Sequence, residues 1–389
     1  MAKKLYDTDS HLRDFSAVLL SCRPAGERKW EILLDQTAFF PEGGGQLADT
    51  GTLTAGETTV RVLDAQETPE GILHLTDGPL PEGPVQGTID WEQRFGRMQC
   101  HSGEHIVSGL AHSRYGCTNV GFHMGEDDVI LDFDKELTAE QIRDLENAAN
   151  RVVWENRAIT AEYPDPAVLK DLDYRSKLDL TENVRIVEIP GIDRCACCAP
   201  HVARTGQVGV VKILTAERHR GGTRITALCG MDAMEDYRAR QESVTAISAL
   251  LSAKREEVAP AVERLLGERD RLKERVASLS MELVRLRAES VLPTEGNLCL
   301  FDTVLDEVAQ RELVNLLMAR CSGAAAVFCG DDENGYRYII GSLHADLRAA
   351  ARNINAAIGG RGGGSPAMIQ GRAAAKAAEI RAYFDSASI

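Results

Sequence analysis

The sequence contains no apolar run close to the roughly 18 residues that a helix needs to cross a bilayer, so we expect no membrane association. It opens without the basic and apolar segments of a secretory signal (MAKKLYDTDSHL). Its 10 cysteines are scattered singly except around position 197, which is unlike the framework of a disulfide-rich secreted domain. We therefore expect a cytoplasmic protein with reduced cysteines.

An excess of positive charge is also missing. The formal net charge is -15, with 44 Lys and Arg residues against 59 Asp and Glu residues. Proteins that bind nucleic acid through their overall charge place clustered Lys and Arg against phosphates. Any contact of this chain with nucleic acid must therefore be local.

At 389 residues the chain is longer than one ordinary core supports, and its patterns divide it into four regions. Residues 1–90 alternate short β-type runs with turn residues, which predicts a β-barrel-like module. Residues 91–231 mix strands with helical patterns, one of them capped by Thr138, and predict an α+β domain. Residues 232–292 indicate a helical spacer, and residues 293–389 a glycine-rich α/β domain. The expected fold class is multidomain α+β.

The spacer carries an apolar series after an expected break at Pro260. When Arg269 is counted as one position of the series, successive members are alternately three and four residues apart, which is the spacing of a heptad seam. The apolar members are Val262, Leu265, Leu272, Val276, Leu279, Leu283 and Leu286. Two interpretations stay open, a helical arm that packs on its own chain and a coiled coil between two copies. A homodimer through the C-terminal domain is a further alternative.

Two short clusters offer metal ligands. His101 and His105 are four positions apart, so on a helix both imidazoles lie on one face and can reach one ion. Cys197 and His201 follow a predicted strand in a loop of small residues. Three imidazoles and a thiolate favour zinc over magnesium or calcium. Glu104 is out of register with the glutamate of HExxH motifs, so we expect it to face solvent or to support a ligand from behind.

Two further segments are candidates for contacts with phosphate. Five of the six residues from 359 to 364 are glycine, among them Gly362, Gly363 and Gly364. Such a run is either a flexible linker or, before a helix, a place where backbone N–H groups approach a phosphate. From Asp346 to Ile389, six basic side chains face three acidic ones, a net of +3 that is either a binding face or a solvated one. Arg220 and Arg224 flank another glycine turn, which is either a phosphate contact or a solvated turn.

These motifs together resemble a known family. HSGEH at 101–105, the CxxxH cluster with VARTGQVG after it, and TAFFPEGGGQLADTG at 37–51 are similar to the alanyl-tRNA editing proteins of the AlaX type and to the editing half of alanyl-tRNA synthetase. GGRGGGSPAMIQG resembles the glycine-rich C-terminal domain of those synthetases. The resemblance covers nearly the whole chain, in the family's order, and fits a long form of AlaX.

The resemblance implies hydrolysis of mischarged alanine tRNA that carries serine, with glycine as a further candidate. It implies zinc ligands at His101, His105, Cys197 and His201, a serine-contacting threonine at Thr37, a functional glutamine at Gln46, and a pocket wall at Gly43, Gly44 and Gly45. One departure concerns the cysteine cluster, which reads CCAPH where the family often has CxGTH. Cys195 and Cys198 are therefore rival ligands, and Cys198 is the nearer in sequence.

The residues leave the role of the zinc open. It either activates a water through an open position or, with four protein ligands, anchors the substrate end. A non-catalytic tRNA or RNA binder with a structural zinc is the alternative function. We do not expect a complete alanyl-tRNA synthetase, because the order of motifs leaves no room for ATP motifs, nor a DHH phosphoesterase, because no DHH string is present.

Overall fold

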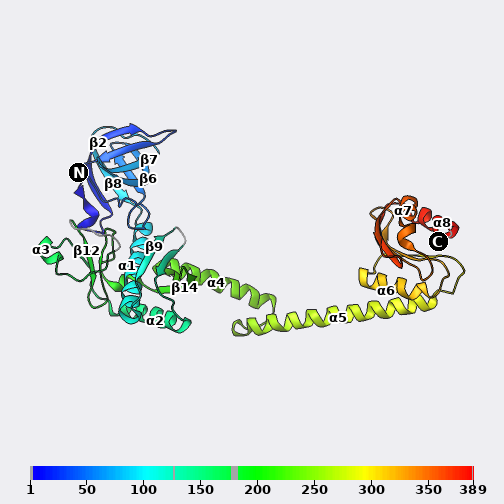
Figure 1. Ribbon diagram of the computed structural model, residues 1–389. Coiled ribbons are helices and arrows are strands. Elements are labelled where there is room, and N and C mark those ends of the chain that lie inside the picture. The colour runs from blue at the N-terminus through cyan, green and yellow to red at the C-terminus, as the bar shows by residue number, and fades with distance from the viewer. Residues whose placement is uncertain (1–2, 126–127, 177–182, 388) are drawn as a thin grey trace. The chain divides into compact units, whose positions relative to one another are not determined.

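The structure is a computed structural model that describes residues 3–125, 128–176, 183–387 and 389. The chain forms two units, Met1–Val244 and Thr245–Ile389. Figure 1 shows the elements of each unit, and together they give a multidomain α+β protein, as predicted.

The first unit begins with a closed six-stranded barrel, which confirms the predicted β-barrel-like module. Burial alternates along its strands because successive side chains point to opposite faces. A β-bulge between Val62 and Asp64 resets this alternation, so that Ala65 takes the next interior position. In barrel order the strands are β2 (Asp14–Pro24), β3 (Trp30–Leu34), β7 (Gly71–Thr76), β6 (Thr58–Thr68), β5 (Gly51–Ala55) and β8 (Pro84–Ile89).

Three short elements precede the barrel strands or interrupt them. β1 (Lys3–Lys4) pairs in parallel with β4 (Gln36–Thr37), and η1 (Leu5–Asp7) follows β1. β4 leads into the glycine-rich loop before β5. This pairing therefore fixes the start of the loop that carries the predicted pocket residues.

The rest of the first unit is built around α1 (Trp91–Tyr115), which is buried without interruption from Met98 to Ala111. Helix α1 contacts α2 (Ala139–Glu155) and strands of two sheets. One sheet has the order β14 (Val211–His219), β15 (Gly222–Cys229), β10 (Val129–Phe133) and β9 (Asn119–Met124), and the other β11 (Thr160–Glu162), β12 (Ile186–Ile189) and β13 (Asp193–Ala196). This part of the first unit also contains the short helices α3 (Pro166–Leu169) and η2 (Thr205–Val208).

Helix α2 begins where the sequence predicted. Thr138 accepts a hydrogen bond from the backbone N–H of Gln141, and the Gln141 side chain accepts one from the backbone N–H of Thr138. This reciprocal capping box satisfies two amides that a helix start leaves unpaired.

The helical spacer consists of α4 (Gly230–Leu250), η3 (Arg255–Glu257) and α5 (Val258–Ser290). The break lies at residues 251–257 and not at Pro260, which sits in the first turn of α5 where its missing N–H costs no helical bond. The seven apolar side chains of the heptad series are all exposed on α5. On another side of the helix, Val284 and Ala288 are buried against α6.

The second unit ends in a five-stranded sheet with the order β16 (Leu298–Asp302), β17 (Ala325–Asp331), β18 (Gly335–Gly341), β20 (Met368–Ala373) and β19 (Gly360–Gly364). β16 and β17 are parallel, and the other pairs are antiparallel. The helices of this domain are α6 (Glu307–Met318), α7 (Leu347–Ala357) and α8 (Ala377–Ser386).

The glycine run is neither a flexible linker nor a loop before a helix, and both interpretations made from the sequence are wrong. It forms the edge strand β19, in which Gly362 lies opposite Gly371 of β20. A Cβ on either residue would lie 2.7 Å from the Cα of the other, so only glycine allows this approach. The predicted phosphate cradle at a helix start is therefore absent from this segment.

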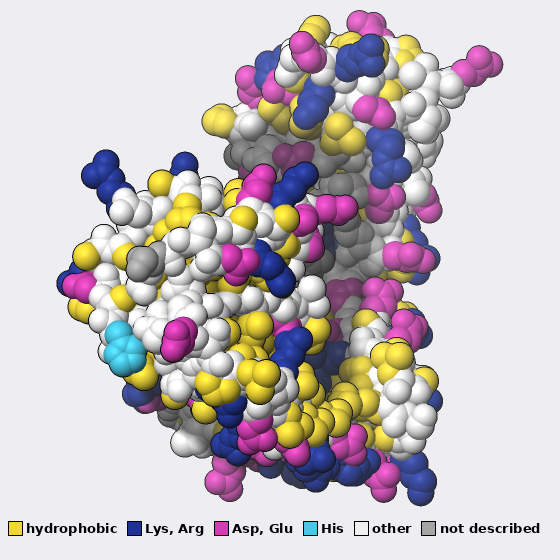
Figure 2. Space-filling model, turned by 90° about the vertical axis from the view of Figure 1, so that its right-hand side faces the viewer, with side chains coloured by type: hydrophobic (Ala, Val, Ile, Leu, Met, Phe, Trp, Pro, Cys, Tyr) yellow, Lys and Arg dark blue, Asp and Glu magenta, His cyan; other side chains and the backbone are white. Residues whose placement is uncertain are grey.

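Among the described residues, no helix is long and apolar enough to cross a membrane. Figure 2 shows Lys and Arg side chains intermixed with Asp and Glu on the face it displays.

Candidate metal centre

Four side chains converge beside α1. His101 and His105 lie one turn apart on this helix, and Cys197 and His201 lie in the loop after β13. Their ligand atoms all lie within 4.8 Å of one another. Cys197 Sγ is 3.4 Å from Nε2 of His101 and 3.4 Å from Nε2 of His201. The structure thus brings the four predicted ligands together.

Each imidazole of this cluster is oriented by a partner at Nδ1. His101 Nδ1 lies 3.0 Å from Gln46 Oε1, His105 Nδ1 lies 2.9 Å from Asp193 Oδ2, and His201 Nδ1 lies 3.0 Å from Ser102 Oγ. When Nδ1–H donates to these oxygens, Nε2 keeps its lone pair for a metal. All three rings are therefore arranged as Nε2 ligands.

The electrostatics of the cluster suit a cation. Burial opposes ionisation of the Cys197 thiol. The combined electrostatic effect of the nearby His101 and His201 is larger than this effect of burial and holds the pKa of the thiol well below its usual range. Burial lowers the pKa of His201 to about 3, which leaves this imidazole neutral at pH 7. Burial also penalises a charged His105, yet hydrogen bonds with Asp193 and Cys197 raise its pKa well above the ordinary value. Metal binding at such a site would replace the proton of His105.

The geometry fits zinc. Zinc bonds of about 2.3 Å to sulfur and about 2.0–2.1 Å to nitrogen in a tetrahedral site place the two ligand atoms about 3.6 Å apart. The two sulfur–nitrogen distances of 3.4 Å are close to that separation. One thiolate with three imidazoles is a donor set typical of zinc.

The glycine-rich loop of the barrel lies against this cluster. Its Gly45 carbonyl accepts a hydrogen bond from the backbone N–H of Met124 in β9, at 2.9 Å. Gly44 and Gly45 have positive φ values of 61° and 82°, and a Cβ on Gly45 would lie 2.7 Å from the Phe122 ring. Gly43 forms an isolated bridge with Gln46. Gln46 is buried, and among the described residues its Nε2 has no hydrogen-bond partner.

Thr37 of β4 is fully buried, and its described partners are His74 on barrel strand β7 and the backbone of Phe39 just after β4. Its Oγ1 lies 2.8 Å from His74 Nε2 and accepts a hydrogen bond from the Phe39 N–H at 3.1 Å. His74 Nδ1 lies 3.1 Å from the Ile32 carbonyl, an obligate acceptor, so Nδ1 carries the proton. Since burial lowers the pKa of His74 to about 4, Nε2 accepts and the Thr37 hydroxyl donates.

The rival cysteines occupy different positions. Cys198 is exposed, and its Sγ lies 3.4 Å from where a Cβ on Gly44 would be. Cys195 is buried and groups with His105 and Asp193 in a second possible ligand set, which shares only His105 with the four-ligand cluster. Burial raises the pKa of both thiols. Neither has the environment that favours a thiolate at Cys197.

Glu104 does not face solvent, so that alternative is wrong. The side chain is buried, and its Oε1 accepts hydrogen bonds from Ser108 Oγ at 2.6 Å and Asn119 Nδ2 at 2.7 Å. Its Oε2 lies 3.8 Å from His105 Nε2. The carboxylate therefore borders the cluster.

The remaining predicted contact residues lie elsewhere. Arg220 is exposed at the turn between β14 and β15 with a φ of 48°. Arg224 is paired with Asp132, with nitrogen–oxygen distances of 2.7 and 2.8 Å. Gly362, Gly363 and Gly364 belong to the second unit. The pairing of Arg224 leaves Arg220 as the better candidate for a phosphate contact in this hairpin.

Sequence reasoning missed the side chains that hold the ligands in place. Asp193 and His74 belong to none of the motifs that predict the site, and Ser102 lies within HSGEH without being one of its predicted ligands. No spacing rule predicts such contacts, because Asp193 meets His105 across 88 positions of the chain and Ser102 meets His201 across 99. The available signal was the polar character of α1, since buried polar side chains in a helix need partners.

Comparison with known proteins points to one class. Residues 184–226 match the family model of the threonyl and alanyl tRNA synthetase second additional domain, and residues 21–93 match that of class II (A) tRNA synthetases. The first match includes Cys197 and His201, and the second covers most of the barrel. The fold and the cluster thus define a domain similar to one found in tRNA synthetases.

The relatives are alanine–tRNA ligases. The chain is 28% identical to that of Ignicoccus hospitalis over 373 residues, which cover 93% of this chain and 40% of the relative. It is 32% identical to that of Halobacterium salinarum over 361 residues (87% and 38%), and 30% identical to that of Pyrococcus abyssi over 398 residues (95% and 42%). The chain thus spans about two fifths of the length of these curated relatives. The predicted relationship to alanyl-tRNA synthetase and its editing part is confirmed.

Proposed function

We propose that this chain is a zinc-dependent hydrolase that acts in trans on mischarged alanine tRNA, with serine as the main misattached amino acid and glycine as a further candidate. The observation that carries the proposal is the cluster of His101, His105, Cys197 and His201, whose imidazoles are each braced at Nδ1. The relationship to alanyl-tRNA synthetase supplies the substrate class. A small pocket rejects serine poorly when alanine is wanted, so a second hydrolytic site is a physical remedy.

The four ligand residues would hold the zinc, which when bound supplies a positive charge that polarises an oxygen of water or of the substrate ester. Four protein donors favour a role as anchor for the substrate end, because catalytic zinc usually keeps three protein ligands. Within the described part of the chain, the buried Gln46 Nε2 is a donor without a partner beside His101, and it would bind an oxygen of the aminoacyl group. The loop at Gly43, Gly44 and Gly45 would form the wall of that pocket.

Thr37 would distinguish serine from alanine by accepting a hydrogen bond. Its own proton is committed to His74 and it already accepts from the Phe39 N–H, which leaves one lone pair free. The serine hydroxyl would donate to this lone pair, and alanine has no group to do so.

Contacts with the tRNA body would come from local features. Arg220 is exposed at its turn, and Arg361 lies opposite Arg372 across the exposed edge of the C-terminal sheet, beside Gly362, Gly363 and Gly364. These arginines suit backbone phosphates, which position a tRNA without reading its sequence. Binding measured at rising salt should show a shallower slope after each Arg-to-Ala change.

The decisive assay incubates the purified protein with seryl-tRNA and alanyl-tRNA of the alanine acceptor and follows the remaining ester. Editing predicts loss of the seryl form and sparing of the alanyl form. Cys197→Ala should abolish the loss, whereas the matched Cys198→Ala should retain it. Binding of tRNA without turnover would instead support a non-catalytic tRNA or RNA binder with a structural zinc, which the closed set of four donors also fits.

A further inference from the structure

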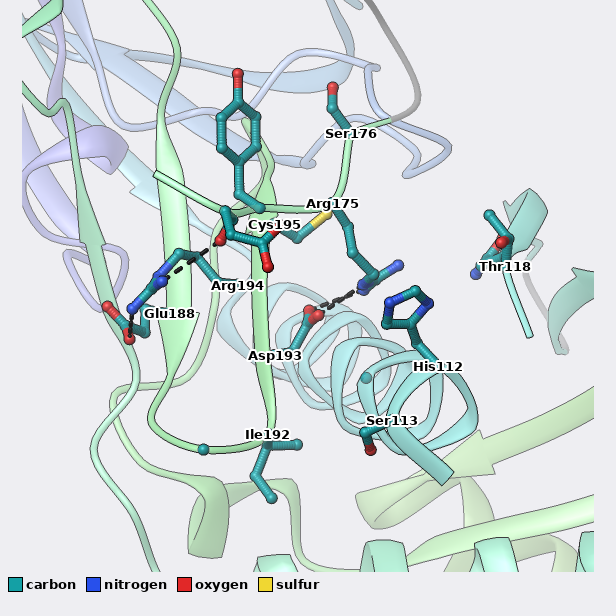
Figure 3. Close-up of a pocket in the computed structure, with 15 residues that line it drawn as sticks. His112, Ser113, Thr118, Arg175, Ser176, Glu188, Ile192, Asp193, Arg194 and Cys195 are labelled. Carbon is teal, nitrogen blue, oxygen red and sulfur yellow. Dashed lines mark hydrogen bonds and ion pairs between the residues drawn. The ribbon is translucent and has the colours of Figure 1, made fainter. Parts of the chain in front are cut away.

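A cavity of about 530 Å³ lies behind the metal centre, on the Nδ1 side of His105. It is lined by parts of α1, of β13 and of the segment that carries Arg175. Figure 3 shows Arg175 pointing across this cavity toward Asp193, with the His112 ring beside its guanidinium. None of the proposed zinc ligands lines the cavity.

Arg175 is fixed both by its backbone and by its side chain. Its N–H donates to the Arg194 carbonyl at 2.8 Å, and its carbonyl accepts from the Ala196 N–H at 2.9 Å, so this segment joins the edge of β13. The guanidinium binds Asp193 as a fork, with Nε 2.6 Å from Oδ1 and Nη2 2.8 Å from Oδ2. These two contacts fix the rotation of the Asp193 carboxylate about its Cβ–Cγ bond.

The held carboxylate is the one that orients His105. Asp193 Oδ2, which accepts from Arg175 Nη2, also lies 2.9 Å from His105 Nδ1. The Asp193 side chain is only 2% exposed, so it cannot exchange Arg175 for water without opening the cavity side. Rotation of this carboxylate would turn the imidazole and move Nε2 away from the other three ligands.

We propose that Arg175 is a positioning residue, which fixes His105 for zinc through Asp193. The inference rests on the zinc site of the proposed function but does not depend on the reaction catalysed. A lysine at this position would keep the charge but not the two-point fork, because an ammonium is a point charge whereas a guanidinium matches both carboxylate oxygens. An alanine would leave the carboxylate exposed to water through the cavity.

Arg194 provides a matched control. It follows Asp193 in strand β13 and lines the same cavity as Arg175. Its guanidinium forms an ion pair with Glu188 at 2.6 Å. Neither Arg194 nor Glu188 has a described contact with a proposed zinc ligand. Arg194→Ala therefore removes an arginine, its ion pair and a 3.4 Å hydrogen bond to the Asp173 carbonyl, but leaves the contacts of Arg175 with Asp193 and of Asp193 with His105 in place.

The test measures zinc affinity by competition with a chromophoric chelator, and the visible spectrum of the cobalt-substituted protein. Asp193→Ala should weaken zinc binding by about 10–100-fold, the usual effect of losing a partner of a ligand histidine. Arg175→Ala should show a large part of that loss, Arg175→Lys an intermediate one, and Arg194→Ala none. The cobalt spectrum should shift in the Arg175 and Asp193 variants alone.

A double-mutant cycle separates positioning from a general loss of structure. If Arg175 acts through Asp193, Arg175→Ala should add no further loss of zinc affinity in the Asp193→Ala background. Additive effects, or an Arg175→Ala protein with the zinc affinity and cobalt spectrum of the wild type, would overturn the proposal. A wild-type protein that binds no zinc would overturn the metal centre itself, whereas zinc binding without deacylation would contradict only the proposed reaction.

Discussion

The guanidinium of Arg94 on α1 and the carboxylate of Asp49 at the end of the glycine-rich loop form a buried ion pair, with Nε 2.9 Å from both carboxylate oxygens. Arg94 also donates to the carbonyls of Ala38 and Ser10, and Asp49 accepts from the Phe40 N–H. The pair thus ties the barrel loop that holds Gln46 to the helix that holds the histidines. It sits two turns before His101.

Replacing Arg94 by Met should destabilise the first unit by about 3–5 kcal/mol, because it leaves the charge of the buried Asp49 carboxylate without its ion-pair partner. Urea unfolding followed by tryptophan fluorescence measures this directly, since Trp30, Trp91 and Trp154 all belong to Met1–Val244. The matched control is Arg61→Met. Arg61 pairs with Asp90 at 3.3 Å, but its side chain is 59% exposed, so the change should cost at most about 1 kcal/mol. Equal losses in the two variants would contradict a special role for the buried pair.

Serine variants of the three neighbouring cysteines identify which sulfur binds the zinc. Cys197→Ser should lose bound zinc, because the oxygen of serine is not a thiolate and the pKa of Cys197 is the one held low by neighbouring imidazoles. Cys195→Ser and Cys198→Ser should keep one zinc per chain, measured by elemental analysis after dialysis. Zinc lost from Cys198→Ser and kept by Cys197→Ser would reverse the assignment.

The sequence predicted the barrel, the α2 cap and the pairing of two ligand clusters, because each depends on short-range patterns. Alternation predicts strands, and a Thr directly before a helical pattern predicts a helix start. It did not predict that the glycine run is an edge strand, since that requires Gly371 on another strand to lie opposite Gly362. Nor did it predict Asp193 or Arg175 beside His105, because such contacts depend on how separate segments pack and leave no periodic signal.

Thr37→Val should impair removal of serine more than it impairs zinc binding. Valine keeps the size of threonine but offers no lone pair to a serine hydroxyl, and Thr37 has no described contact with the four ligands. Deacylation of seryl-tRNA and zinc content are measured on the same preparation. Thr37→Ser is the control that retains the hydroxyl and should retain activity. Equal deacylation rates for Thr37→Val and wild type would exclude the proposed contact.

The buried His74 makes the barrel sensitive to acid. Burial lowers the pKa of His74 to about 4, below the ordinary value of 6.5, so the unfolded chain takes up a proton that the folded chain refuses. The free energy of unfolding should therefore fall as pH drops from about 6.5 toward about 4, by up to about 3 kcal/mol from this group. His74→Gln should flatten this part of the curve relative to wild type in urea titrations at each pH. A curve of unchanged steepness would exclude His74 as a contributor.

The exposed heptad series of α5 should pair with a second copy in parallel. In a parallel coiled coil, Glu268 faces Lys273 of the second copy and Glu282 faces Arg287, whereas an antiparallel pair in matching layers sets Glu268 against Glu282. These charges are exposed on α5, although Arg287 also contacts Asp302 of its own domain. The charge pattern therefore favours the parallel arrangement over an antiparallel one in matching layers.

Parallel alignment in register places Val276 opposite Val276 of the second copy, so Val276→Cys should form a disulfide-linked dimer under mild oxidation. Glu274→Cys, on the opposite face of the helix, is the matched control and should not cross-link. Light scattering should report a dimer for wild type and a monomer for Leu272→Glu combined with Leu279→Glu, because both changes put charge into the seam. A wild-type monomer would favour an arm that packs on its own chain, and a dimer that resists the double change would move the interface to the C-terminal domain.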